Sequence, residues 1–494
     1  MQEYKLFLNG EWLDSSTGET FEDINPATLE PIGLFQKASP EDVKNAVDSA
    51  RDAFDSWSST PAPQRGKILF RAASMLEERK EELARLMTVE NGKIVKESRG
   101  DVQEAIDMAY YAAGEGRRLL GETAPSELQD KFCMTVRRPI GVVGLITPFN
   151  FPLAIPAWKI MPALITGNTV VLKPSSDTPL IAIELMKILS RAGVPKGVIN
   201  LVTGDGDKVG AALVRNKSVR AISFTGSFDT GKWIMSEASK EMKRVSLELG
   251  GKNPIIVMDD ADMELVVDGV LWGAFGTSGQ RCTAASRVIV HEKILPTFEK
   301  RLVKRVERLR LGSGLDETVD MGPLINASQV RKVENYVAIG KDAGARLVQG
   351  GRRVQPLPGY FFEPTIFSDV FQEMKIAQEE IFGPILSLMS AESLDEAIDI
   401  ANSVVYGLSS SIYTENIKNA FKAIEKIDAG ITYINAPTIG AEIHLPFGGV
   451  KATGNGTREA GTVAIDEFTE LKTVYFDYSG RLQKAQIDTE KVDE

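Results

Sequence analysis

The chain has 494 residues with a net charge of −11, and 43% of its residues are hydrophobic. This length predicts two or three domains with large cores. The acidic balance argues against nucleic acid as a partner, because phosphate binding needs a basic surface. Residues 1–10 lack the apolar core of a signal peptide, and no apolar run reaches the roughly 20 residues that span a bilayer. We therefore expect a cytoplasmic protein with no membrane partner.

The chain contains two cysteines, Cys133 and Cys282, and two histidines, His291 and His444. A disulfide framework is not expected in a cytosolic chain of this size. No close Cys/His spacing predicts a metal site, so we expect no metal. With so few imidazoles, a carboxylate is the more available general base.

The first half of the chain predicts helices, then a hairpin, then an α/β pattern. Residues 40–120 are predicted to be mostly helical, with the strongest amphipathic spacing over 65–86. Residues 121–138 mix polar and β-prone residues, which predicts a hairpin projecting from the domain. Strands are then predicted at 140–147, 168–173, 198–203, 219–225, 245–249 and 254–258. The predicted helices between them cover 179–192 and 209–215, and a third begins near Ser227, a common N-cap type. This alternation indicates a doubly wound parallel sheet.

A second alternating region follows Gly251. It contains a predicted strand at 286–290 and predicted helices at 295–311 and 393–402. Residues 469–478 alternate apolar and polar side chains and predict a strand. A lone terminal strand needs a partner, and the sheet of another subunit is one that could supply it.

Cys282 lies in a polar turn rich in glycine, GQRCT (279–283). Structural cysteines usually occupy apolar runs. One interpretation is therefore a reactive thiol, with Arg281 favouring the thiolate. The other is a buried free cysteine.

Two further residues carry an ambiguous signal. Glu248 ends an apolar strand just before two glycines, where desolvation would raise its pKa and make it a useful base. The alternative for Glu248 is an acid exposed to water on an edge strand. Asn150 follows a strand and lies between aromatic residues and prolines, so it is either an oxyanion donor or a turn former.

The signals for phosphate binding are weaker. Residues 204–210 have one residue too many before the last glycine for the standard dinucleotide fingerprint. Gly226 and Ser227 precede a helix N-terminus, where free N–H groups and the helix dipole can hold a pyrophosphate. Lys173 follows a strand, from which its amine could reach a ribose.

Taken together, these motifs resemble those of the aldehyde dehydrogenase superfamily, over nearly the whole chain and in the family's order. The resemblance is carried by TPFNFP around Asn150, LKPSSDTP at Lys173, FTGS at Gly226, LELGGKNP at Glu248, GQRC at Cys282, EEIFGP at Glu380 and LPFGGVKATGNG at Phe447.

The resemblance implies four catalytic residues. Cys282 matches the nucleophile, Glu248 the base that activates water, and Lys159 a lysine lining the site. Asn150 and the Cys282 backbone N–H match the oxyanion hole. The cofactor residues that it implies are Ile146, Thr147, Pro148, Lys173, Ser176, Gly206, Gly210, Gly226, Ser227, Leu249, Glu380 and Phe382.

The implied fold is α/β. It comprises a Rossmann-like, doubly wound cofactor domain (residues 1–120 and 139–248), a second α/β catalytic domain (249–465) and a small β-arm for oligomerisation (121–138 and 466–494). The expected assembly is a homodimer or homotetramer.

Two departures from the family pattern concern ligand contacts. Phe149 stands where many members carry Trp. Ser176 stands where members that prefer NAD often have Glu, a carboxylate that binds the ribose hydroxyls and repels a 2′-phosphate. Its absence favours NADP⁺ over NAD⁺, although Asp177 could reverse that preference.

The predicted reaction is NAD(P)⁺-dependent oxidation of an aldehyde to a carboxylate through a thiohemiacetal and a thioester. Three alternatives remain. A CoA-acylating member would tend to lack Glu248, a non-redox cysteine hydrolase would leave the cofactor motifs unexplained, and a non-catalytic descendant would be expected to lose Cys282, Glu248 or Asn150.

Residues 435–449 look like those of semialdehyde-oxidising members, including those for α-ketoglutaric semialdehyde. An acidic substrate would need a cation, and Arg281 is a candidate; a broad-range aldehyde enzyme is equally compatible.

Overall fold

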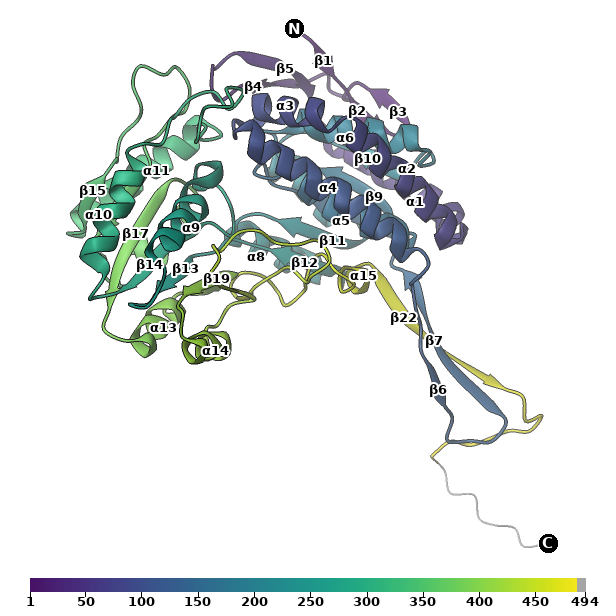
Figure 1. Cartoon of the computed structure of the whole chain (residues 1–494). Coiled ribbons are helices and arrows are strands. Elements are labelled where there is room, and N and C mark those ends of the chain that lie inside the picture. Colours follow the sequence, from purple (N-terminus) through teal and green to yellow (C-terminus); the bar gives the residue numbers. More distant parts are fainter. Residues whose placement is uncertain (487–494) are drawn as a thin grey trace, which may run out of the picture.

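The computed structural model describes residues 1–486. Figure 1 shows two α/β units side by side, with a long β-arm projecting from one of them. The last eight residues of the predicted arm, 487–494, lie outside the described residues.

The first unit is built on a seven-stranded sheet in the order β12-β11-β8-β9-β10-β2-β3. The first five of these strands pair in parallel, and β2 and β3 are added antiparallel at one edge. Their bounds are β2 (Leu6–Leu8), β3 (Glu11–Leu13), β8 (Val142–Ile146), β9 (Thr169–Lys173), β10 (Ile199–Leu201), β11 (Val219–Thr225) and β12 (Arg244–Glu248). The predicted parallel sheet is therefore confirmed.

Helices cover both faces of this sheet, which explains why its strands are apolar throughout. On β8, Val143 and Leu145 face one core and Val142 faces the other. The helices on the first face are α2 (Ala62–Glu78), α3 (Lys80–Asn91), α4 (Val95–Glu115), α5 (Ala154–Thr166) and α6 (Pro179–Ala192). Those on the second face are α1 (Pro40–Ser59), α7 (Ala211–Arg215) and α8 (Phe228–Ser239).

In the second unit, too, helices cover both faces of a central sheet. Its sheet runs β15-β16-β17-β14-β13-β19-β20, with only β15 antiparallel among these seven strands. The strands are β13 (Asn253–Val257), β14 (Ala285–His291), β15 (Arg346–Gln349), β16 (Thr365–Ser368), β17 (Ile385–Ala391), β19 (Ser409–Tyr413) and β20 (Ile431–Ile434). The helices are α9 (Met263–Phe275) and α10 (Leu295–Val306) on one face, and α11 (Ala327–Asp342), α12 (Lys375–Gln378), α13 (Leu394–Asn402) and α14 (Ile417–Lys426) on the other.

The arm is a three-stranded antiparallel sheet in the order β22-β7-β6. It consists of β6 (Thr123–Pro125), β7 (Lys131–Pro139) and β22 (Thr469–Asp477), which follows the short helix α15 (Ala464–Glu467). The terminal strand is therefore not alone, because β22 pairs along its whole length with β7 of the same chain. Only its outer edge is left for another subunit.

Several elements differ from the sequence-based expectation. The stretch of strongest predicted amphipathic spacing, 65–86, is divided between two helices, α2 and α3. They meet at Arg79, whose guanidinium reaches Glu184 of α6 at 2.8 Å. Helix α10 ends at Val306 rather than at residue 311. Two small sheets were not anticipated: β1 (Glu3–Tyr4), β4 (Thr20–Ile24) and β5 (Pro31–Gln36) form one, and β18 (Tyr406–Gly407) and β21 (Val450–Lys451) form the other.

Candidate active site

Cys282 lies in a strained loop between α9 and β14. Within this loop Thr277 and Ser278 both adopt left-handed backbone conformations, with φ of 51° and 56°. Residues other than glycine rarely adopt this conformation. The loop is held by hydrogen bonds from the Thr277 N–H to Glu97 (2.8 Å) and from the Ser278 hydroxyl to the Gly322 carbonyl (2.7 Å). Strain retained in this way is common at functional sites.

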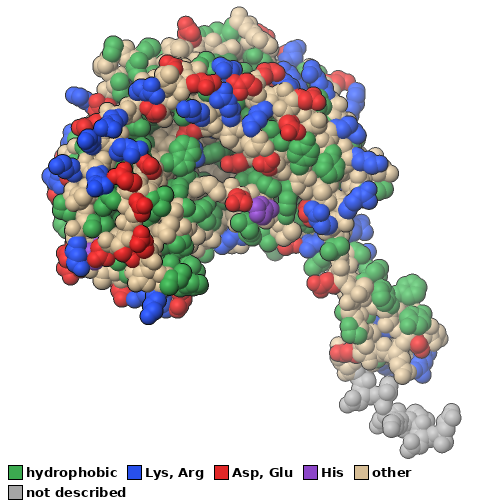
Figure 2. All heavy atoms as spheres, viewed as in Figure 1, with side chains coloured by type: hydrophobic (Ala, Val, Ile, Leu, Met, Phe, Trp, Pro, Cys, Tyr) green, Lys and Arg blue, Asp and Glu red, His purple; other side chains and the backbone are tan. Residues whose placement is uncertain are grey.

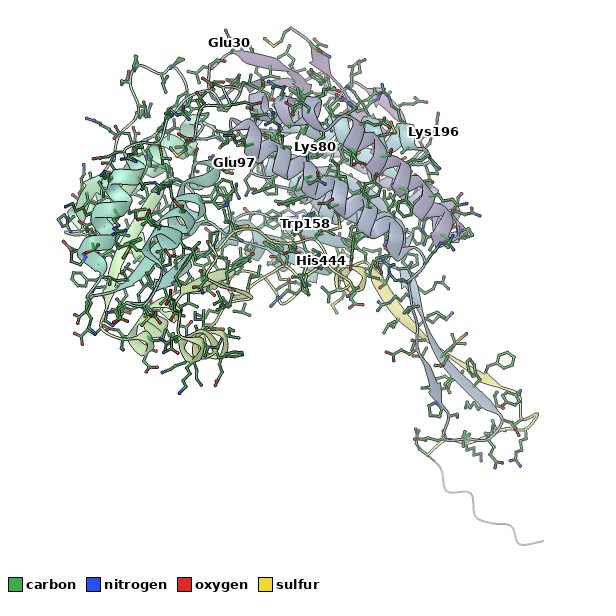
Figure 3. All side chains as sticks on the ribbon, in the orientation of Figure 1. Glu30, Lys80, Glu97, Trp158, Lys196 and His444 are labelled. Carbon is green, nitrogen blue, oxygen red and sulfur yellow. The ribbon has the colours of Figure 1, made fainter. Side chains whose placement is uncertain are left out.

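A narrow cavity of about 70 Å³ brings Cys282 and Glu248 together at the junction of the two units. Figure 3 shows Glu97 at the end of α4 that faces the second unit, and Trp158 below the helices of the first unit, next to the segment that carries His444. The lining residues are Glu104, Phe151, Ile155, Trp158, Thr225, Glu248, Leu249, Arg281, Cys282, Thr283, Ile439, Gly440, Ala441, Phe447 and Glu459. The cavity is therefore largely apolar, with a thiol and carboxyl groups on its walls.

Glu248 ends β12 and is 3% exposed, so it is not the water-exposed acid of the alternative interpretation. Neither of its carboxylate oxygens has a hydrogen-bond partner within residues 1–486. Burial, followed by the nearby carboxyl groups of Glu459 and Glu467, holds its pKa well above the ordinary value. Glycine at 448 leaves room for this side chain, because a Cβ there would lie 2.7 Å from Glu248 Oε1.

The thiol of Cys282 is not activated by Arg281, contrary to the hypothesis from the sequence. Burial and the carboxyl groups of Glu248 and Glu380 raise the pKa of Cys282 to about 12. The Arg281 guanidinium points instead to Glu97, at 3.1 Å, and its Nε donates to the Thr277 hydroxyl at 2.9 Å. In this state the protein therefore holds Cys282 as a neutral thiol.

Asn150 and Lys159 are both buried, but neither lines the cavity of Cys282. The Asn150 carbonyl accepts a hydrogen bond from Lys93 Nζ (2.7 Å), and its side-chain oxygen has no partner within residues 1–486. Lys159 is ion-paired with Glu459 and donates to the Ser223 hydroxyl at 2.8 Å. The structure thus places Glu459, rather than Lys159, on the cavity wall.

Glu459 and Glu467 were missed by the sequence analysis. Glu467 ends α15 and accepts a hydrogen bond from the Ser246 hydroxyl at 2.9 Å, and burial raises its pKa to about 8. Ser246 and Glu248 lie two residues apart on β12 and so share one face of the strand. No local pattern marks these acids, because their partners are distant in sequence.

A second cavity, of about 790 Å³, opens at the carboxyl ends of β8, β9 and β11 and at the N-terminus of α8. Parallel strands bring these ends to one edge of the sheet, where α/β folds bind ligands. Ser227 caps α8 by accepting from the Thr230 N–H. Eight of the predicted cofactor residues line this cavity: Ile146, Thr147, Pro148, Lys173, Gly206, Gly210, Gly226 and Ser227.

Ser176 does not line this cavity, although its neighbour Ser175 does. The Ser176 hydroxyl donates to the Gly204 carbonyl at 2.9 Å. Asp177 accepts from Asn326 Nδ2 at 3.0 Å. Burial lowers the pKa of Lys173 to about 8, while Asp177, Asp205 and Asp207 act in the opposite direction.

The other predicted cofactor residues lie nearer the thiol. Leu249 lines the cavity of Cys282. Glu380 accepts from the Gly251 N–H at 3.1 Å, and burial raises its pKa. Phe382 packs edge-on against Phe149 at 5.8 Å between ring centroids, with its backbone left-handed at φ 60°.

Helix α11 supplies two further residues that the sequence analysis missed. Gln329 Nε2 donates to the carbonyls of Ile381 (3.0 Å) and Phe382 (2.7 Å), which holds this strained turn. Lys332, together with Lys252, is a cation whose charge lowers the pKa of Glu380, and burial lowers the pKa of Lys332 itself.

The model of the aldehyde dehydrogenase family matches residues 12–474, and the chain belongs to this family. It is therefore a nicotinamide-dependent oxidoreductase that acts on aldehydes. It is 44% identical to the α-ketoglutaric semialdehyde dehydrogenase of Bacillus subtilis, over 96% of this chain and 98% of that protein. It is 42% identical to the D-glyceraldehyde dehydrogenase (NADP⁺) of Picrophilus torridus, over 96% of each. Among solved structures, betaine aldehyde dehydrogenase of Staphylococcus aureus in complex with NAD⁺ superposes with a TM-score of 0.95 and 38% identity, covering 97% of this chain and 95% of that one.

In the described part of the chain, no helix is long and apolar enough to cross a membrane.

Proposed function

We propose that this protein oxidises an acidic semialdehyde to the carboxylate, with Cys282 as the nucleophile and Glu248 as the base for hydrolysis. The observation that carries the proposal is the narrow cavity that the Cys282 thiol shares with the Glu248 carboxyl group, which has no hydrogen-bond partner within residues 1–486. The apolar walls exclude water and strengthen electrostatic interactions inside. The similarity to semialdehyde dehydrogenases supports this substrate class.

The reaction begins when the Cys282 sulfur bonds to the aldehyde carbon and the thiol proton ends on the aldehyde oxygen. We assign the stabilisation of the charge on that oxygen to the Cys282 backbone N–H and, from the family motif, to the amide of Asn150, whose neighbour Phe151 lines the cavity. A nicotinamide held in the larger cavity would supply the hydride acceptor; loss of the hydride from the thiohemiacetal carbon and of the hydroxyl proton to solvent leaves the thioester. Glu248 then takes a proton from water as the water oxygen attacks the thioester carbon, which releases the carboxylate and restores the thiol.

A buried polar cluster near Glu248 consists of Glu459, Lys159 and Ser223. The Ser223 hydroxyl lies 3.3 Å from Glu459 Oε1, and both groups contact Lys159 Nζ. Among the described residues, Glu248 makes no hydrogen bond to these groups, so Glu459 acts on the base through its charge, which helps to raise the pKa of Glu248. Lys159 therefore acts here through Glu459 and not by contact with the substrate.

The residues of the larger cavity fit a nicotinamide dinucleotide. The free N–H groups at the N-terminus of α8 suit a pyrophosphate, since the helix dipole is positive there. Lys173 presents a buried amine for ribose hydroxyls, and a volume of about 790 Å³ suits a nucleoside. Glu380 and Lys332 would hold the second ribose near Cys282, with Phe382 flanking the nicotinamide.

We propose residues 1–120 and 139–248 as the cofactor domain and 249–465 as the catalytic domain.

We further propose NADP⁺ as the preferred cofactor, with NAD⁺ also used. Support comes from Ser176, because its hydroxyl turns to Gly204 and leaves no carboxylate at this position to repel a 2′-phosphate. The nearby Asp177 is engaged by Asn326. The similarity to an NADP⁺ enzyme and to an NAD⁺ complex is compatible with dual use.

Ser176→Glu should shift preference toward NAD⁺, raising the KM for NADP⁺ by about tenfold or more, because a carboxylate here repels the 2′-phosphate. Initial rates with each cofactor measure the effect. Ser176→Gln is the matched control, because it adds the same bulk without the charge. An unchanged NAD⁺/NADP⁺ ratio in Ser176→Glu would discard this role for position 176.

The arm is proposed to join subunits into a homodimer or homotetramer. Figure 2 shows apolar side chains gathered on the projecting arm. Leu471 and Tyr475, on one face of β22, are 63% and 67% exposed. Two clefts of about 1020 and 720 Å³ flank the base of the arm, and Arg137 and Thr469 line both. Large exposed apolar surfaces of this kind mark protein interfaces.

The double variant Leu471→Lys/Tyr475→Lys should therefore dissociate the assembly, since it places two charges in the proposed interface. Light scattering coupled to gel filtration measures the mass. Phe421→Lys, at an equally exposed apolar position on α14, should leave the mass unchanged. A double variant that keeps the wild-type mass would rule the arm out as the main contact.

The first test of the function is nicotinamide reduction by the purified protein with a panel of aldehydes, with NAD⁺ and NADP⁺ in parallel and without CoA. Turnover with semialdehydes above neutral aldehydes is the expected result. Activity only after addition of CoA would instead assign an acyl-transferring reaction.

The free state of both cysteines fits a reducing compartment, and the cytoplasm is the proposed location.

A further inference from the structure

Glu104 places a carboxyl group in the active-site cavity at a position that no sequence motif marks. It comes from the middle of α4, is partly buried, and lines the same cavity as Cys282. Most of its neighbours on that wall are apolar, among them Phe151, Ile155 and Ile439. A polar group in such a cavity is positioned to contact the part of the substrate that is remote from the aldehyde.

Arg281 supplies a cation on the wall of the same cavity, and its charge acts on Glu104. Its guanidinium is fixed by Glu97 through Nη2 and by Thr277 through Nε, and it packs over the rings of Phe151 (5.4 Å) and Trp272 (4.9 Å). Among the described residues, these hydrogen bonds leave Nη1 for a ligand. The Glu97 carboxylate already balances the charge of Arg281, however, so Arg281 alone has little surplus charge for a second anion.

The ionisation of Glu104 therefore decides which substrate charge the cavity accepts. Burial, followed by the negative charge of Asp101, raises the pKa of Glu104 to about 8. Lys93 pairs with Asp101 at 2.7 Å, so its charge is also balanced. The charged and titratable groups that act on Glu104 are Asp101 and Asp107 of α4, Lys93, Arg281 and Tyr433 of β20. At neutral pH the carboxyl group is consequently protonated and is a hydrogen-bond donor.

We propose that Glu104, as the neutral acid, and Arg281 together bind the carboxylate of a semialdehyde substrate. Arg281 contributes a charged N–H donor, and the Glu104 O–H donates to the second carboxylate oxygen. Ionised Glu104 would repel the same group. This inference rests on the proposed function and adds the pair of residues that selects an acidic substrate.

The test compares succinic semialdehyde with butanal, which has the same chain length and no charge. Because both aldehydes use the same thiol and base, the ratio of their kcat/KM values cancels the pH dependence of the chemistry. Between pH 7 and pH 9 this ratio should fall about tenfold in the wild type, since one unit above the pKa about a tenth of Glu104 remains protonated. In Glu104→Gln the ratio should stay flat, because the amide donates at every pH.

Glu78→Gln is the matched control, because Glu78 is an exposed acid at the end of the neighbouring helix α2 and is not among the groups that act on Glu104. This variant should keep the wild-type pH dependence of the ratio. A flat ratio in the wild type, or a tenfold fall that persists in Glu104→Gln, would overturn the role of Glu104.

Betaine aldehyde, which carries a positive charge, tests the opposite possibility, in which ionised Glu104 binds a cationic substrate. A preference for betaine aldehyde over butanal that is lost in Glu104→Gln would make the site cation-binding and overturn the inference. Oxidation of butanal without preference for succinic semialdehyde would overturn the inference and leave aldehyde oxidation standing. Absence of oxidation of every aldehyde, butanal included, would instead contradict the proposed function, and the inference that rests on it would fail too.

Discussion

Cys282→Ala is expected to abolish aldehyde oxidation, with a loss of about 10⁴-fold or more, because removal of a nucleophile leaves no covalent route. The cavity shared with Glu248 gives the sulfur access to substrate even though its pKa is raised to about 12. Nicotinamide reduction measures the loss. Cofactor binding, followed by quenching of tryptophan fluorescence, should be retained, because the dinucleotide cavity lies at the edge of the other sheet.

Cys133→Ala is the matched control for this variant. Cys133 is the other cysteine of the chain and lies on β7 of the arm. Its replacement should leave turnover at the wild-type rate. Persistent oxidation by Cys282→Ala would eliminate the thioester route, and loss of activity in both variants would point to a general effect of removing a thiol.

Glu248→Gln is expected to uncouple the two halves of the reaction. The thioester should still form, so rapid mixing should show one equivalent of reduced nicotinamide per site. Steady-state turnover should then fall by about 10²–10⁴-fold, since general base catalysis of this kind contributes roughly that much. Glu241→Gln, an exposed acid just before β12, should behave like the wild type.

The pH dependence gives a second readout of the same base. Burial and the charges of Glu459 and Glu467 raise the pKa of Glu248, and only the ionised form accepts a proton from water. The hydrolysis rate of the wild type should therefore rise with pH through this raised pKa. In Glu248→Gln this rise should vanish. A variant that hydrolyses the thioester at the wild-type rate would mean that another group acts as base.

Much of the fold was predictable because local patterns carry it. The apolar runs of β8, β9 and β11, with the helices predicted after β9 and β11, indicated the parallel sheet of the first unit, whereas α5, the helix after β8, was not predicted. The small N-terminal sheet was not predicted, because β1, β4 and β5 lack the continuous apolar runs of the buried strands and depend on pairing with one another. The break between α2 and α3 was missed for a related reason, since the contact of Arg79 with Glu184 spans 105 residues.

The sequence by itself determined the family, the thiol at Cys282 and the acid at Glu248, because these belong to short motifs whose residue types and order are visible without a structure. Only the tertiary structure decided what surrounds them. It turned Arg281 to Glu97, 184 residues away, joined Lys159 to Glu459, 300 residues away, and brought Glu104 into the cavity. The physical reason is that charge and burial at a site depend on groups that packing brings together, and the spacing of neighbouring residues does not encode such contacts.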